Sequence, residues 1–86
     1  MSHQEEFSAS TDELTTAVQS VVETFRPYRA DHRPDCSDFE RWLIWNDQTS
    51  ERLGIVALDV TEHALSLWEK KVLLRSRAMD LLRNAA

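Results

Sequence analysis

The chain has 86 residues and a formal net charge of −5, with fifteen Asp and Glu against ten Lys and Arg. This length allows one domain, and we expect a flexible leader over residues 1–9 followed by a single domain over residues 10–86. The acidic balance disfavours a nucleic-acid partner, because nucleic-acid-binding domains usually carry a strong basic patch. No apolar run approaches the roughly 18 residues of a membrane span, so we expect no membrane partner either.

Composition also limits the fold and the compartment. One glycine and two prolines are too few for the many tight turns of a sandwich or a barrel, whereas Leu, Ala, Glu, Arg and Gln are good helix formers. Cys36 is the only cysteine and has no partner for a disulfide within the chain. The first residues lack the pattern of a signal peptide. These features predict an all-α, cytoplasmic protein, built as a compact three-helix domain with a long C-terminal helix.

The first predicted helix has the clearest pattern. Ser10 and Glu13 have the spacing of a capping box, in which each side chain caps the other residue's backbone amide. The apolar residues that follow recur every three or four positions and share one stripe of a helix. They are Leu14, Ala17, Val18, Val21, Val22 and Phe25. We therefore predict a helix from Thr11 to Arg26 that ends before Pro27.

A loop and a second helix are predicted next. Residues 27–36 hold both prolines and alternating charges, which is typical of a loop. Residues 37–40 repeat the capping-box pattern, and the helix that they begin would end near residue 46. Its apolar face would hold Phe39, Trp42 and Leu43. We place Trp42 in the core, whereas Trp45 lies off this face and is a candidate for partial exposure and for partner contact.

The start of the last helix is ambiguous. It could begin near Thr49, or at Asp59, which forms a third capping box with Glu62. Residues 54–58 fit a helix turn or a short strand, and we prefer a helix or an irregular loop because a lone strand would have nothing to pair with.

Two adjacent apolar rows follow in this helix. One row is Val60, Ala64, Leu67, Leu74, Ala78 and Leu81, and the other is Leu65, Trp68, Val72, Met79 and Leu82. Together they cover about half of the helix circumference, more than the roughly 100° that one core contact needs. This width suggests that another molecule covers part of the last helix.

No group of residues has the spacing of a catalytic or metal site. Asp31, His32 and Cys36 lie close in sequence, but zinc needs three or four ligands with paired spacings. A nucleophilic thiolate also needs a base that a third group orients. The single glycine excludes a glycine-rich phosphate loop. We predict no catalytic, cofactor-binding or metal-binding residue, no cofactor and no enzymatic activity.

One segment, Leu53–Glu62, is similar to the segment around the modified serine of acyl carrier proteins. Ala57 stands where the serine that bears phosphopantetheine would be, and Val56 replaces the aspartate before it. The attachment point of the prosthetic arm is therefore absent, and we infer no carrier activity.

Charge is distributed unevenly along the chain. Residues 1–24 hold five acids and no Lys or Arg, whereas residues 63–86 hold five bases and two acids. We interpret this asymmetry as two ends of the chain that pack side by side and compensate each other. A basic tail helix that meets an anionic partner is the alternative.

These observations favour a small non-enzymatic protein-binding module, namely an adaptor, an inhibitor or a regulatory protein that docks through helical faces. The predicted protein-binding residues are Trp45, Leu65, Trp68, Val72, Met79 and Leu82. The partner is another protein, and we expect a homodimer paired through the last helix. The alternative is an accessory or structural subunit of a larger enzyme or secretion assembly.

Overall fold

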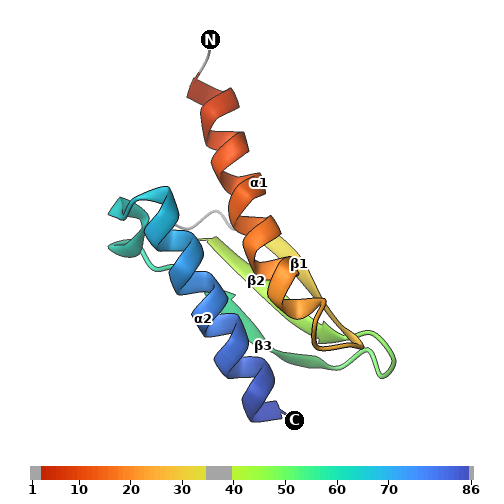
Figure 1. Ribbon diagram of the computed structural model, residues 1–86. Helices are drawn as coiled ribbons and strands as arrows, with labels where there is room; N and C mark the ends of the chain where they lie inside the picture. The colour runs from red at the N-terminus through yellow and green to blue at the C-terminus, as the bar shows by residue number, and fades with distance from the viewer. Residues whose placement is uncertain (1–2, 35–39, 86) are drawn as a thin grey trace.

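The computed structural model describes the backbone of residues 3–34 and 40–85, and the side chains of residues 12–33 and 40–85 (Figure 1). The elements in chain order are α1 (His3–Val22), β1 (Tyr28–Pro34), β2 (Glu40–Asn46), β3 (Arg52–Ala57), the short 3-10 helix η1 (Glu62–Ala64) and α2 (Leu67–Ala85). The fold is therefore α+β, and the prediction of an all-α, three-helix domain is wrong.

The molecule has two layers. The three strands form an antiparallel sheet in the order β1-β2-β3. Helices α1 and α2 pack against each other and lie on the same face of this sheet, where they run side by side in the same direction (Figure 1). None of the helices in the described residues lies on the opposite face of the sheet, and the first turns of α1 extend past the end of the sheet (Figure 1).

The predicted second helix is strand β2. Along this strand Trp42 and Ile44 are buried, whereas Leu43 and Trp45 are only partly buried. This alternation has the period of two that a strand produces. The same short apolar run also fits the three-and-four spacing of a helix, which is why periodicity alone gave the wrong element. The prediction that Trp42 lies in the core is confirmed.

The predicted loop over residues 27–36 contains strand β1. Its residues pair with β2 from Tyr28 opposite Asn46 to Pro34 opposite Glu40. Most of β1 is polar, and such residues have no strong preference for a strand, so the pairing with β2 determines the conformation. The predicted cap at Ser37 and the lone cysteine, Cys36, lie outside the described residues.

Residues 54–58 were expected to be helical or irregular, and this prediction is also wrong. They lie mostly in β3, which pairs with β2 and places Leu43 opposite Ile55. The objection that a strand here would have no partner depended on the error at β2. Gly54 faces α2, and a Cβ atom at this position would lie 2.8 Å from Cδ1 of Leu81. Glycine therefore allows close approach of α2 to the sheet.

The core lies between the helices and the sheet. Its buried side chains are Leu14, Ala17, Val18, Val21, Val22, Ala30, Trp42, Ile44, Val56, Leu58, Leu74, Ala78 and Leu82. Five of the six residues in the predicted stripe of the first helix are in this set, and the sixth, Phe25, packs against it. The helix itself begins at His3 and ends at Val22, rather than running from Thr11 to Arg26.

Candidate protein-binding surface

The surface that we consider first is built around the start of α2. Ser66 precedes the helix, and its Oγ accepts a hydrogen bond from the amide of Glu69 at 3.2 Å. The Glu69 carboxylate in turn accepts from the amide of Ser66 at 3.3 Å. This reciprocal pair is a capping box, and it fixes the first turn of α2. The sequence pattern was present but was missed, because the helix was expected to run on from Asp59.

Upstream of this cap, a second capping box orders the segment between the sheet and α2. Asp59 accepts a hydrogen bond from the amide of Glu62, and Glu62 accepts one from the amide of Asp59, both at 2.8 Å. The predicted pairing of these two residues is confirmed, but it lies at the start of η1, whose N-cap residue is Thr61, and not at the start of the long helix. Between the two boxes, Leu65 adopts an extended conformation that separates η1 from α2.

The guanidinium of Arg77 ties this segment to α2 and to the sheet. It pairs with the Glu62 carboxylate through both terminal nitrogens and donates a 2.6 Å hydrogen bond to the carbonyl of Ala57 at the end of β3. The hydrogen bonds from Arg77, followed by that from the amide of Asp59, lower the pKa of Glu62 from 4.5 to about 2. The carboxylate therefore stays ionised in neutral solution, and the connection persists.

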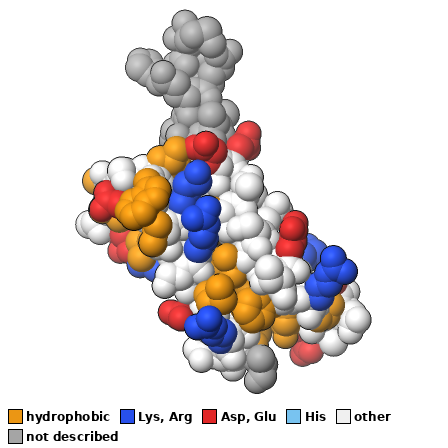
Figure 2. Space-filling view, in the orientation of Figure 1, with side chains coloured by type: hydrophobic (Ala, Val, Ile, Leu, Met, Phe, Trp, Pro, Cys, Tyr) orange, Lys and Arg blue, Asp and Glu red, His pale blue; other side chains and the backbone are white. Residues whose placement is uncertain are grey.

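An exposed apolar patch lies on this framework. Leu65, Trp68 and Val72 are the members of what we call the α2 patch, and Trp68 is 71% exposed. Trp68 and Val72 are four residues apart on α2 and therefore lie on one side of its axis, and Leu65 is an extended residue just before this helix. Figure 2 shows hydrophobic side chains beside Lys and Arg over the part of the surface where α2 begins. Large side chains so exposed in a small domain are typical of an interaction site.

The six predicted protein-binding residues do not form one surface. Leu65, Trp68 and Val72 share the α2 patch, but Leu82 is only 1% exposed and belongs to the core, and Met79 is half-buried against it. The C-terminal half of the predicted row is therefore covered from within the chain. Trp45 lies on β2, in the other layer of the molecule.

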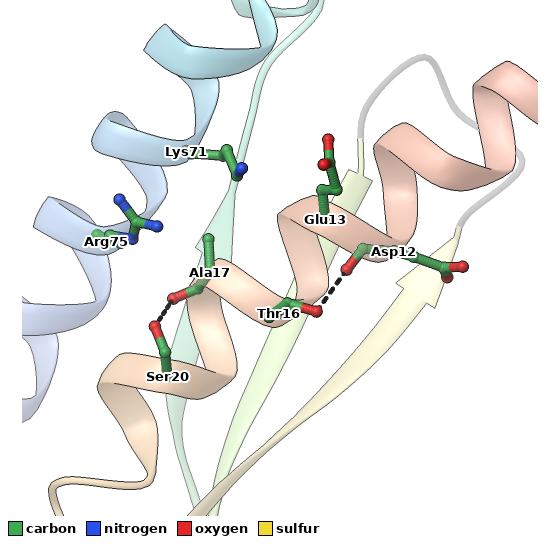
Figure 3. Close-up of a pocket in the computed structure, with 7 residues that line it drawn as sticks. All are labelled: Asp12, Glu13, Thr16, Ala17, Ser20, Lys71 and Arg75. Carbon is green, nitrogen blue, oxygen red and sulfur yellow. Dashed lines mark hydrogen bonds between the residues drawn. The ribbon is translucent and has the colours of Figure 1, made fainter.

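A groove between the two helices lies beside the α2 patch. It has a volume of about 320 Å³. One wall comes from α1 and the other from α2, from which the two basic side chains project toward α1 (Figure 3). The lining residues are Asp12, Glu13, Thr16, Ala17, Ser20, Lys71 and Arg75. Helices α1 and α2 thus bring the acidic and the basic end of the chain side by side, which is the packing part of our interpretation of the charge asymmetry.

The charged side chains of the two groove walls form no ion pair with each other among the described residues. Asp12 and Glu13 stand on the α1 wall, and Lys71 and Arg75 on the α2 wall. Within the described part of the chain, none of the four takes part in the ion pairs that form, which involve other residues. The groove therefore presents one negative and one positive wall whose charges remain available to a partner.

Two other features, a metal site and a membrane-spanning helix, are absent from the described part of the chain. Among the side chains described there, no three His, Cys, Asp or Glu residues gather in an arrangement that could hold a metal ion. None of the helices in that part is both long enough and apolar enough to cross a bilayer. No protein-family model matches this chain, and no curated protein or solved structure matches it.

Proposed function

We propose that the protein is a small non-enzymatic protein-binding module, and that its α2 patch pairs with a second copy of the chain about a two-fold axis. The observation that carries this proposal is the exposure of Trp68, with Leu65 and Val72 beside it, at the rigid start of α2. Exposed Trp is costly in water and is enriched at the energetic centres of interfaces. The module would act as an adaptor, an inhibitor or a regulatory protein, and its single cysteine fits the cytoplasm.

The groove beside the patch favours a second copy over an unrelated partner. About a two-fold axis every contact occurs twice: where one residue of the first copy contacts another residue of the second copy, the same two residues also meet with the copies exchanged. The acidic wall of Asp12 and Glu13 in one copy can then face the basic wall of Lys71 and Arg75 in the other. The surface is therefore complementary to itself in charge. Pairing also enlarges the core of a chain whose length leaves the core small.

Sedimentation equilibrium tests this proposal. We expect the wild-type chain to sediment near twice its 10.0 kDa mass, and Val72→Glu to shift it to the monomer by placing an unpaired charge in the apolar contact. Asn84→Glu adds the same charge at an exposed site near the end of α2 and should leave the dimer intact. A wild-type monomer at all concentrations, or an equal effect of both variants, would overturn the proposal.

A further inference from the structure

The face of the sheet that the helices leave open has an unusual composition. Residues opposite each other in register share a face, and alternate residues of a strand point to opposite faces. Because Trp42 and Ile44 point toward the helices, the register assigns the other positions to the open face. These are Arg29, Asp31 and Arg33 on β1, Arg41, Leu43 and Trp45 on β2, and Arg52, Ile55 and Ala57 on β3. We call this set the open sheet face.

The middle of the open sheet face is apolar. Leu43 lies directly opposite Ile55, which is 45% exposed, and Trp45 lies two residues further along β2. An antiparallel sheet with one solvated face normally alternates apolar and polar side chains. Strand β2 instead carries large apolar side chains on both faces. The Nε1 of Trp45 is buried and has no hydrogen-bond acceptor among the described residues. The strip is therefore partly exposed, although its side chains are apolar.

Arginines surround the apolar strip. Four arginines and one aspartate lie on the open sheet face, although the whole chain has a net charge of −5. Arg29 is engaged by Asp31 and Asp47, each at 2.6 Å. Arg33 and Arg52 are exposed and form no ion pair with another described residue. They stand at diagonal corners, since Arg33 lies at one end of β1 and Arg52 pairs with Trp45 at the other end of the sheet.

Two arginines around apolar side chains fit carboxylates better than nucleic-acid phosphates at this place. Single-stranded nucleic acids need open aromatic faces on which bases stack, but the guanidinium of Arg29 lies over the Trp45 ring, 5.8 Å from its centroid. The other apolar residues of the strip are aliphatic. The net negative charge of the protein also opposes the approach of a long polyanion. Guanidinium groups bind carboxylates through paired hydrogen bonds.

We propose that the open sheet face binds an acidic amphipathic helix of a partner protein. The strand spacing and the rise along a strand separate the Arg33 and Arg52 backbones by about 16 Å. A helix rises 1.5 Å per residue, so two glutamates about eleven positions apart span this distance and lie on one face. Leucines at the fourth and seventh positions after the first glutamate share that face and meet the apolar strip. The proposal does not depend on pairing through the α2 patch, because the two surfaces lie on opposite sides of the molecule.

Fluorescence anisotropy with a labelled synthetic helix tests the inference. The probe has about 18 residues, with two glutamates and two leucines at this spacing, and the matched control carries glutamine in place of both glutamates. We expect the full-length protein to bind the glutamate probe at least about tenfold more tightly than the control, and more weakly as salt is raised. Arg33→Glu with Arg52→Glu should abolish the preference, whereas Arg26→Glu with Arg83→Glu, at exposed sites elsewhere, should not.

Two further measurements separate this inference from the proposed function. The Val72→Glu variant should bind the glutamate probe as the wild type does, even if it no longer forms dimers. A probe with lysines in place of the glutamates should bind the Arg33→Glu, Arg52→Glu variant, which would also show that this variant is folded. Equal binding of the glutamate and glutamine probes would overturn the inference. The inference would also be overturned if only the Val72→Glu variant lost binding of the glutamate probe. The same holds if a single-stranded oligonucleotide bound to the protein while the glutamate probe did not.

Discussion

At the scale of single residues, Glu62 makes the segment before α2 sensitive to pH. Its carboxylate joins Arg77 to the η1 segment, and its pKa in the folded chain is about 2, against a usual 4.5. A lowered pKa means that the folded state binds the proton less readily than the unfolded state. The stabilisation is therefore complete above about pH 4.5 and is lost as the pH falls toward 2.

The prediction is that acidification destabilises the wild type more than Glu62→Gln. Between pH 5 and 2, the free energy of unfolding should fall with a slope that is up to about one proton steeper in the wild type. Urea unfolding at several pH values measures this slope. Glu51→Gln, at an exposed site in the turn between β2 and β3, is the control and should keep the wild-type slope. The prediction would be contradicted if the free energy of unfolding depended on pH in the same way in the wild type and in Glu62→Gln.

Trp42 shows what the sequence could establish about one residue. Its assignment to the core was correct, although the reason, a helix face shared with Leu43, was wrong, because Leu43 points to the opposite face of strand β2. Its surroundings were not predictable. The indole Nε1 donates a 3.0 Å hydrogen bond to Oγ1 of Thr15 on α1, and the ring stacks on His32 of β1, with centroids 5.0 Å apart. Both partners are distant in sequence, so no local pattern indicates them.

At the scale of elements, the contact between β3 and α2 depends on Gly54. A side chain there would meet the end of Leu81, with 2.8 Å between the added Cβ and the Leu81 Cδ1. We predict that Gly54→Val destabilises the fold by about 1–3 kcal/mol through overpacking. Leu81→Ala should lower the free energy of unfolding less in the Gly54→Val variant than in the wild type, because the shortened side chain leaves room for the valine.

A double-mutant cycle from urea denaturation measures this coupling, which should reach at least about 0.5 kcal/mol. Ile55→Ala provides the matched control, since Ile55 follows Gly54 in β3 but belongs to the open sheet face. Its effect should add to that of Leu81→Ala within about 0.5 kcal/mol. If Gly54→Val and Leu81→Ala were also additive, α2 would not approach β3 as closely as the structure describes.

The elements were predictable where their pattern is local. The apolar stripe of α1 and the Asp59–Glu62 capping box depend on neighbours in sequence, and both are present in the structure. The sheet was missed because its three strands are defined by one another. Strand β1 is mostly polar, and β2 fits the periodicity of a helix as well as that of a strand. Neither segment can therefore be recognised as a strand until its pairing partner is known. The error at β2 then removed the partner of β3 and led to a second error.

The candidate surfaces were predictable to different degrees for the same reason. Helical spacing groups Trp68 with Val72 on α2, but it does not show that Leu65 is extended and precedes the helix, or that the body of the fold covers Leu82. The arginines of the open sheet face are scattered along the chain. Only the strand register places Arg29, Trp45 and Arg52 in one row across the sheet, and a sequence interpreted as helices contains no such row.

For the whole molecule, pairing through the α2 patch predicts that stability depends on protein concentration. Association stabilises the folded state by mass action, so the midpoint of thermal unfolding should rise by about 4 °C for each tenfold increase in concentration. Circular dichroism over a hundredfold concentration range measures this shift. Val72→Glu should unfold at one temperature throughout, and Asn84→Glu should behave as the wild type does. A wild-type midpoint independent of concentration would contradict a stable dimer.

The parallel course of α1 and α2 has a mechanical consequence. Both helices run the same way along the sheet, so the start of α1 and the end of α2 lie at opposite ends of the molecule (Figure 1). Tension applied through these two points pulls the helices past each other along their shared contact. Such a shear load acts on the whole contact between α1 and α2 at once, rather than separating the two helices one turn at a time. The fold is thereby arranged to resist stretching from its ends more strongly than a pair of antiparallel helices would.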